Sequence, residues 1–325
     1  MEYLNIEDEI KYYAKRYELK RKIEDMLLLK GYTHIEPSTF ENYEKFISLN
    51  KKIKKESMVK VLNGGSDVLV LRPDSTTNII KKLIPRWQED TKLKLFYNST
   101  VFRNNPNSNI REINQMGVEY FGEAPLKADR EVLGLALDIL NKFNGGFILE
   151  VSNSKYIRGL FEAINIDDEQ EKHLKDFIYR KNKFELMDYI KTLNIEKGLH
   201  DCLSNILDLQ GDILGIAKKA KGYYTNRAME EALEELVILS NFIEEEGYSQ
   251  YVHFDLSMVT ELDYYDGIIF KGYYPNSFKD IISGGRYDSF TKDFGRLVSA
   301  IGFSLDLDEL TEVNCKKKGE VHGLY

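Results

Sequence analysis

The pattern of apolar and polar residues near the start of the chain predicts a helix over residues 10–30. One apolar stripe at helical spacing is formed by Leu19, Ile23, Met26 and Leu27. Gly31 follows directly, at a position where glycine commonly ends a helix. Residues 32–36 then read as a short strand that Pro37 closes.

Two pairs of apolar segments predict β-hairpins. Residues 58–62 and 68–71 flank a turn rich in Gly, Asn and Asp, and residues 94–103 and 110–122 flank a second polar turn. On the last strand, alternation puts Arg111, Ile113, Gln115, Gly117 and Glu119 on one face and Met116, Val118 and Tyr120 on the other. We therefore expect a sheet with one packed side and one open side, and the open side is a candidate ligand floor.

The rest of the pattern divides the chain into a core and an insertion. Helices are expected over residues 76–83 and 128–143, and a strand over 147–151. Residues 165–246 carry helical patterns with lysine- and glutamate-rich faces, strand patterns return over 251–282, and a last helix begins near residue 306. This order favours an α+β fold, in which residues 1–164 and 247–325 form an antiparallel sheet flanked by helices and residues 165–246 form a helical insertion.

Composition and charge limit the classes of partner that we expect for this chain. The 325 residues include 45 Lys and Arg against 53 Asp and Glu, a formal net charge of −8, which disfavours RNA binding. The one basic run, residues 51–55, reads as a solvated face. Cys202 and Cys315 lie far apart without metal-ligand spacing, so we expect a reduced, cytoplasmic setting and no metal. Neither a membrane-length apolar run nor a signal-peptide pattern is visible.

Three segments resemble, in the right order, the signature motifs of class II aminoacyl-tRNA synthetases. The first is the helix with Ile35-Glu36-Pro37, which in that family builds a homodimer interface; the second is Phe102-Arg103 with Arg111-Glu112-Ile113-Asn114-Gln115; the third is Ser283-Gly284-Gly285-Arg286-Tyr287-Asp288 with residues 299–305. Leu71-Arg72-Pro73-Asp74-Ser75-Thr76 and Met258-Val259-Thr260-Glu261-Leu262-Asp263-Tyr264-Tyr265 are similar to two histidine-contacting segments of the histidyl-tRNA synthetases. Each segment alone is weak, whereas together they cover most of residues 8–160 and 251–310.

The resemblance implies a histidine-binding pocket. Its candidate residues are Asp74, Thr76, Gln115, Glu119, Tyr264 and Tyr265. Carboxylates suit an ammonium group and hydroxyls suit a ring nitrogen, so these residue types fit histidine. Asp263 is interpreted as a structural hydrogen-bonding residue.

The adenylation side departs from the family. Of three arginines that carry amino-acid activation, Arg103 matches the first, whereas Thr260 and Glu309 stand where the other two would be. Losing one preorganised donor costs roughly 3–4 kcal/mol of transition-state stabilisation, and here two cations are lost and a carboxylate is added. The motif 2 loop is also shorter, with Asn105 in place of its glutamate. No catalytic residue is assigned, and Arg103, Arg111 and Arg286 remain as candidate anion-binding residues.

A histidyl-tRNA-synthetase-like chain with these losses, and with only residues 311–325 where an anticodon-binding domain would follow, resembles the regulatory subunits of ATP phosphoribosyltransferase. The resemblance implies a non-catalytic subunit that needs no cofactor and assembles, as a homodimer within a hetero-oligomer, with a short-form catalytic subunit in the first step of histidine biosynthesis. It also implies feedback inhibition by histidine, and neither tRNA nor a membrane as partner. Two other functions stay open: a histidine-activating enzyme with altered motifs, and a free-standing histidine sensor for an unrelated protein.

Overall fold

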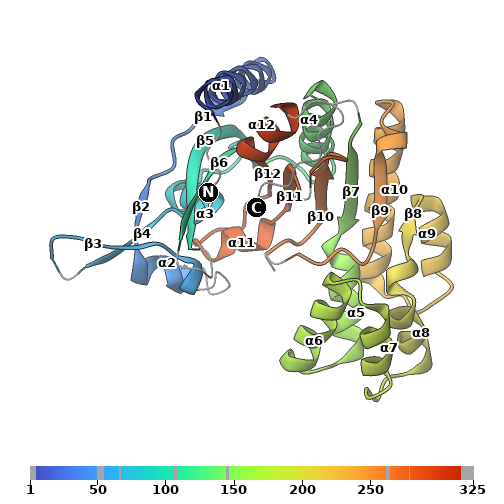
Figure 1. Ribbon diagram of the computed structural model, residues 1–325. Helices are drawn as coiled ribbons and strands as arrows, with labels where there is room; N and C mark the ends of the chain where they lie inside the picture. The colour runs from blue at the N-terminus through green and yellow to red at the C-terminus, as the bar shows by residue number, and fades with distance from the viewer. Residues whose placement is uncertain are drawn as a thin grey trace.

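In the computed structural model, which describes residues 5–49, 55–65, 67–104, 109–143, 146–260, 264–277 and 279–315, a nine-stranded sheet runs through the molecule (Figure 1). In spatial order its strands are β1 (Thr33–His34), β5 (Leu93–Asn104), β6 (Ile110–Phe121), β12 (Ala300–Asp306), β11 (Ile282–Arg286), β10 (Ile268–Tyr273), β7 (Ile148–Asn153), β9 (Val252–Asp255) and β8 (Gln210–Gly211). A smaller sheet has the order β2 (Phe40–Asn42), β4 (Val68–Leu71) and β3 (Lys60–Leu62).

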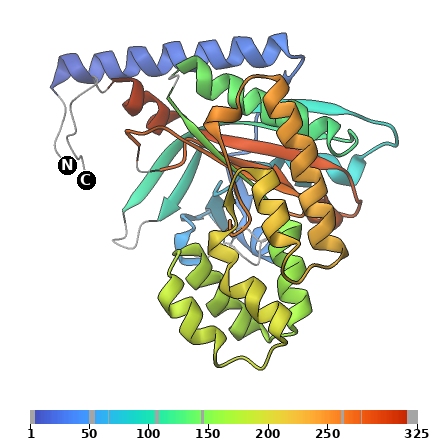
Figure 2. The same cartoon turned by 90° about the vertical axis from the view of Figure 1, so that its right-hand side faces the viewer.

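Helices cover both faces of the large sheet. They are α1 (Ile6–Leu29), α2 (Tyr43–Leu49), α3 (Ser75–Leu83), α4 (Lys127–Phe143), α5 (Ser154–Ile164), α6 (Asp168–Tyr179), α7 (Lys183–Ile190), α8 (Lys197–Ser204), α9 (Ile213–Ala220), α10 (Arg227–Glu245), α11 (Asp288–Lys292) and α12 (Leu307–Cys315). Helices α1, α4 and α12 lie together on one side of the sheet (Figures 1 and 2). Helices α3 and α11 pack on the other side with β5, and this second layer carries the candidate site.

Helix α1 follows its sequence pattern. Asn5 caps it, since its side-chain oxygen accepts from the backbone N–H of Asp8 at 3.0 Å, and Glu7, Asp8 and Glu9 lie in the first turn, where negative charge favours the helix dipole. The residues that face the core are Leu19, Ile23 and Leu27, each 1% exposed. The helix ends at Leu29, and Gly31, two residues later, has a left-handed φ of 82°. The predicted helix is confirmed, with a start four residues earlier than the apolar stripe indicated.

The hairpin of β5 and β6 confirms the predicted alternation. Met116, Val118 and Tyr120 are buried in the core on the side of α1 and α4, and Glu119 faces the opposite side. The expectation that this opposite side is open holds only near Arg111, which is exposed. Glu119 is 1% exposed because Thr76 of α3 and Tyr287 cover it.

The sheet differs from the sequence expectation in two respects. It is antiparallel except that β1 pairs with β5, and β7 with β9, in parallel. Strand patterns were expected to end near residue 282, whereas β11 begins there and β12 follows it. These two strands are buried on both faces and contain Gly284, Gly285 and Gly302, so neither the alternation nor the β-branched content of an ordinary strand marks them.

Residues 165–246 are mostly helical, as their patterns indicated. Helices α6 to α8 lie below the sheet, at the end away from α1 (Figures 1 and 2). However, α10 packs along α5 and against β7, and the short strand β8 joins the large sheet beside β9. The division of the chain at residues 164 and 246 therefore stays a prediction, although α10 and β8, which lie within residues 165–246, pack on the core.

Some sequence expectations fall outside the described residues. They concern residues 51–54 of the basic run, Asn105 of the motif 2 loop, and Asp263. Within the described ranges, none of the helices has the length and apolar character needed to cross a membrane.

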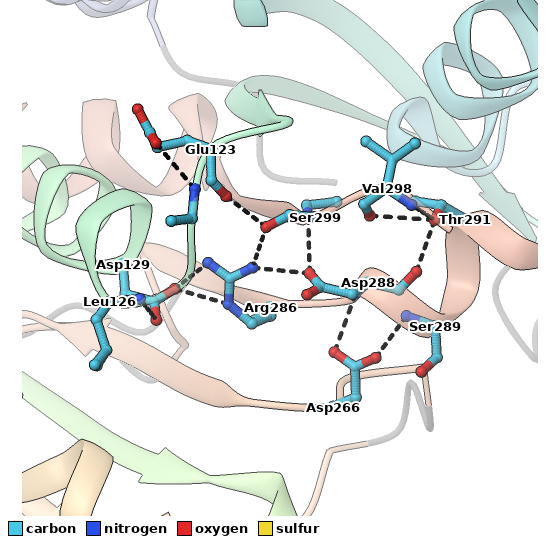
Figure 3. A network of polar contacts seen from close by, with 12 residues as sticks. Glu123, Leu126, Asp129, Asp266, Arg286, Asp288, Ser289, Thr291, Val298 and Ser299 are labelled. Carbon is cyan, nitrogen blue, oxygen red and sulfur yellow. Dashed lines mark hydrogen bonds and ion pairs between the residues drawn. The ribbon is translucent and has the colours of Figure 1, made fainter. Parts of the chain in front are cut away.

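A buried polar network ties the sheet to its flanking helices (Figure 3). Arg286, at the end of β11, donates through Nε and Nη2 to Asp129 of α4, at 2.9 and 2.6 Å. Its Nη1 donates to Asp288 and to the Ser299 hydroxyl, both at 2.8 Å. The Arg286 side chain is 5% exposed and that of Asp129 is 6% exposed. Charges this deeply buried are stable only when paired, so the network fixes where β11 ends.

We expect Asp129→Asn to lower the free energy of unfolding by about 3 kcal/mol, because breaking a buried ion pair leaves an uncompensated charge. Asp288 remains beside the guanidinium, which keeps the loss near the low end of that effect. Urea unfolding measures it. Glu231→Gln, which removes an exposed ion pair with Arg227, is the matched control and should leave the stability unchanged within error. Equal effects of the two substitutions would contradict a structural role for the network.

Candidate functional site

The first wall of the site is the turn that starts α3. Asp74 caps this helix, since its Oδ2 accepts from the backbone N–H of Thr77 at 2.7 Å. Arg72, 5% exposed, donates to the carbonyl oxygens of Pro37 and Thr100 and so holds the turn against β5. Thr76, in the first turn of α3, lies within hydrogen-bond distance of Glu119 on β6.

The centre of the site is the carboxylate of Glu119. Thr76 donates its hydroxyl to Glu119 Oε1 at 2.6 Å, and Tyr287 donates its hydroxyl to Oε2. Burial raises the pKa of Glu119 to about 8, and the two hydroxyl hydrogen bonds partly oppose that rise. Asp74 contributes a smaller rise through its negative charge. In the free protein, Glu119 is therefore mostly protonated near neutral pH.

Four tyrosines surround this carboxyl group. The rings of Tyr264 and Tyr265 have centroids 4.8 Å apart, and Tyr264 also lies 5.9 Å from Tyr287. Tyr97 of β5 is 1% exposed. Burial raises the pKa of Tyr97 well above its usual value, and the charges of Glu119 and Asp74 add to the rise. All four phenols thus stay protonated and can donate as well as accept.

Glycines on two strands leave room for the buried groups. Gly302 of β12 pairs with Glu119, and a Cβ there would overlap Glu119 Oε2 and the Val118 carbonyl oxygen. Gly117 pairs with Tyr97, and a Cβ there would overlap the phenol ring. Side chains at these two positions would displace the carboxylate or the phenol, so both glycines are explained by space.

The structure brings five of the six predicted histidine-binding residues together. Thr76 contacts Glu119, Tyr264 contacts Tyr265, and the charge of Asp74 raises the pKa of Glu119, Tyr264 and Tyr265. Gln115 lies on the same face of β6 but four residues from Glu119, about 13 Å along the strand. Its place in the same pocket remains a prediction.

Two residues of the site were missed by the sequence reasoning. Tyr287 stood inside the third motif, and Tyr97 lay in a strand read only as apolar. Alternation along β5 places Leu95, Tyr97 and Ser99 on the face of Glu119, and this signal was available. No comparable signal pointed to Tyr287, because its contact with Glu119 depends on the pairing of β11 with β12 and of β12 with β6.

The expected phosphate-facing positions give a different picture. Glu309 accepts from Ser277 at 2.7 Å and lies 3.8 Å from Lys279, and Thr260 lines a pocket beside Tyr265. Arg286 was a candidate anion-binding residue, but its guanidinium is buried and bound to Asp129 and Asp288, so that expectation was wrong.

Arg103 and Arg111 differ from Arg286. They are direct cross-strand partners in the hairpin of β5 and β6. Neither is ion-paired to a carboxylate within the described ranges. Two like charges opposite one another destabilise a hairpin, so an anion bound between them would relieve the repulsion.

The site thus combines a buried carboxylate, hydroxyl donors and aromatic walls, a set suited to a small cationic ligand with an N–H group. Within the described residues no cluster of His, Cys, Asp and Glu has the arrangement of a metal site.

Comparison with known proteins agrees with this geometry. The profile of the histidyl-tRNA synthetase family matches residues 8–310. An ATP phosphoribosyltransferase regulatory subunit from Clostridium novyi is 34% identical over 300 residues, which cover 90% of this chain and 71% of that protein. The chain belongs to the family of ATP phosphoribosyltransferase regulatory subunits.

Solved structures agree with the family assignment. An ATP phosphoribosyltransferase regulatory subunit/histidyl-tRNA synthetase from Bacillus halodurans is 29% identical, with a TM-score of 0.84 over 94% of this chain and 80% of that one. A chain of the ATP phosphoribosyl transferase (HisG:HisZ) complex from Thermotoga maritima is 18% identical, with a TM-score of 0.66 over 94% of this chain and 98% of that one, and shows the shared fold alone. The expected class II synthetase-like fold is thereby confirmed for this regulatory-subunit family member.

The raised pKa of Glu119 predicts how the free energy of unfolding changes with pH. Between the unfolded pKa near 4.5 and the folded value of about 8, the folded protein binds more protons than the unfolded chain. The contribution of Glu119 to folding is therefore fully present below about pH 4.5 and is lost as the pH rises toward 8. Gln does not titrate, so Glu119→Gln should gain stability relative to the native protein as the pH rises.

Urea unfolding of both proteins at several pH values measures this difference. We expect the relative gain to be on the order of 3 kcal/mol between about pH 5.5 and pH 8. A difference that stays constant over that range would mean that Glu119 is already ionised in the free protein.

Proposed function

We propose that this chain is the histidine-binding regulatory subunit of a hetero-oligomeric ATP phosphoribosyltransferase. The observation that carries the proposal is the contrast between two sets of positions in one fold. The residues around Glu119 form a buried cluster of hydrogen-bonding and aromatic groups suited to a small ligand, whereas the two positions expected to hold phosphate-facing arginines carry Thr260 and Glu309.

Histidine as the ligand is supported by the chemistry of the pocket. Glu119 can accept from a charged N–H group of the amino acid, and Thr76 and Tyr287 keep its two oxygens in fixed positions. The tyrosine rings provide flat walls for an imidazole, and their hydroxyls can hydrogen-bond to its nitrogens. Binding favours the ionised form of Glu119, so ligand and carboxylate stabilise one another.

We also propose that the chain does not activate amino acids. Adenylation needs fixed cations around the α-phosphate, and the Glu309 carboxylate would repel it. Arg103 and Arg111 remain as a pair that can hold an anion, which fits binding of a phosphate group without chemistry. An amino-acid-activating enzyme is the alternative that this charge pattern disfavours.

We also propose that the chain forms a homodimer and binds a short-form catalytic subunit. The outer face of α1 carries apolar residues at helical spacing, namely Ile6, Ile10, Tyr13 and Tyr17, which are 50–76% exposed. Such a stripe supports a homodimer through the helix of motif 1. The Clostridium novyi protein is named a regulatory subunit, and the Thermotoga maritima structure is a complex, which supports a short-form catalytic subunit as partner here.

Glu119→Gln should raise the Kd for histidine more than tenfold, because a charge-assisted hydrogen bond contributes roughly 1.5–3 kcal/mol. Calorimetry measures the affinity. Glu89→Gln, at an exposed glutamate, is the matched control and should bind histidine like the native protein. Unchanged affinity in Glu119→Gln would place the histidine site elsewhere.

Mixing the purified chain with a short-form catalytic subunit of the same organism should give a complex that forms phosphoribosyl-ATP and that histidine inhibits. Size-exclusion chromatography with light scattering measures the assembly and the homodimer, and phosphoribosyl-ATP formation measures the activity. Co-elution without activation, or no co-elution, would favour a free-standing histidine sensor. Histidine-dependent exchange of pyrophosphate into ATP by the chain alone would instead show an activating enzyme.

A further inference from the structure

A second pocket lies beside Tyr265 of the amino-acid site. Its volume is about 260 Å³, and it opens between α5, α6, residues 258–260 and β10. Tyr265 belongs to both places, because it lines this pocket and its ring lies 4.8 Å from that of Tyr264 in the amino-acid site. Among the described residues, neither Thr76 nor Glu119 lines this pocket, so it is distinct from the amino-acid site and shares Tyr265 with it.

One side of this pocket is apolar. Ile157 and Phe161, one helical turn apart on α5, face Ile269 of β10 across it. Ile157 is 6% exposed, Phe161 5% and Ile269 1%, so the surface is part of the packed core. A volume equal to about nine waters of the liquid suits a small ring or a short branched chain.

The other side carries positive charge. Arg158 of α5 and Lys175 of α6 line the pocket, together with Glu171. Glu171 lies 2.6 Å from Lys175, so these two charges offset one another. Arg158 has no carboxylate partner within the described part of the chain, which leaves one uncompensated guanidinium at the rim. A guanidinium prefers a planar two-oxygen partner such as a carboxylate or a phosphate.

Backbone contacts tie this pocket to the amino-acid site. Ser154, the first residue of α5, donates its hydroxyl to the carbonyl oxygens of Tyr265 and Gly267, at 3.0 and 3.1 Å. A ligand that displaces Arg158 or Phe161 on α5 would therefore act on the backbone of Tyr265. By linkage, each ligand must then change the affinity of the other by the same factor.

We propose that this second pocket binds a small organic anion, with its apolar body against Ile157, Phe161 and Ile269 and its carboxylate or phosphate at Arg158. The site adds a second ligand to the molecule and does not depend on which amino acid occupies the Glu119 site. Because Tyr265 lines this pocket and also belongs to the first site, we expect that ligand to act as an effector of the first site.

Benzoate and phenyl phosphate are the probes, and neutral benzamide is the control ligand. In methyl NMR titrations of the full chain, both anions should shift the Ile157 and Ile269 signals, whereas benzamide should not. The relative Kd values of benzoate and phenyl phosphate distinguish a carboxylate ligand from a phosphate ligand. Histidine should change the Kd of the better probe, and the probe should change that of histidine by the same factor.

Arg158→Gln should weaken probe binding about tenfold, because it removes a charge-assisted hydrogen bond from an exposed residue whose loss leaves the core intact. Arg158→Lys should weaken it less, since the charge is kept. Arg296→Gln, at another exposed arginine without an ion pair among the described residues, is the matched control.

Glu119→Gln separates this proposal from the proposed function, because it should abolish tight histidine binding and leave benzoate binding unchanged. Three results would overturn the second site: equal binding of benzamide, full affinity in Arg158→Gln, or loss of probe binding in Glu119→Gln. The last of these would place the probe in the amino-acid site.

Discussion

The burial of the Glu119 carboxyl group is the constraint around which the site is built. A carboxylate removed from water is unfavourable unless it is protonated or hydrogen-bonded. Here the protein uses both means, since Thr76 and Tyr287 donate to its two oxygens while burial raises its pKa to about 8. An incoming cation reverses the balance, because it stabilises the ionised form that burial disfavours. A ligand with a charged N–H group therefore favours the ionised form of Glu119, and the ionised form in turn favours binding of that ligand.

The surrounding structure keeps these donors in place. Thr76 is set by the capped start of α3, which Arg72 holds against β5. Tyr287 directly follows Arg286, whose guanidinium is fixed by Asp129 and Asp288. The arginine that the third motif contributes therefore acts on the site through the chain and has no free charge to offer to a phosphate. This explains how a motif known from adenylating enzymes can persist where adenylation is absent from the proposed function.

Local patterns predicted the elements that local interactions determine. The stripe of α1, with its cap and terminal glycine, and the alternation of β6 are set by neighbours in the sequence, and the structure confirms both. Strands β11 and β12 escaped notice because they are glycine-containing and buried on both faces, so their position depends on pairing with distant strands. The same limit applies to side chains.

The resemblance gave Glu119 and its neighbours from their motifs, whereas Tyr97 and Tyr287 reach the site through register. Arg286 was misjudged for a related reason. A sequence shows a cation but not the two carboxylates that neutralise it from α4 and from the start of α11. Gln115 lies on the same face of β6 as Glu119, four residues along the strand, and its place in the pocket stays a prediction.

The family assignment and the site geometry together describe a fold that keeps an amino-acid pocket while its expected phosphate-facing positions hold a threonine and a glutamate. Coupling to a partner requires that histidine binds with different affinity in the active and inhibited states. Such a difference can arise at Glu119, because small movements of Thr76 or Tyr287 change how well the carboxylate is stabilised. Tyr265, shared with the pocket beside it, offers a second place where the affinity can be altered.

The ionisation of Glu119 is most directly measured by a pH titration of its carboxyl ¹³C signal by NMR, in the free protein and with saturating histidine. We expect a midpoint near pH 8 in the free protein and a fall of that midpoint when histidine binds. A midpoint near that of an ordinary glutamate in the free protein, or one that histidine leaves unchanged, would contradict this expectation.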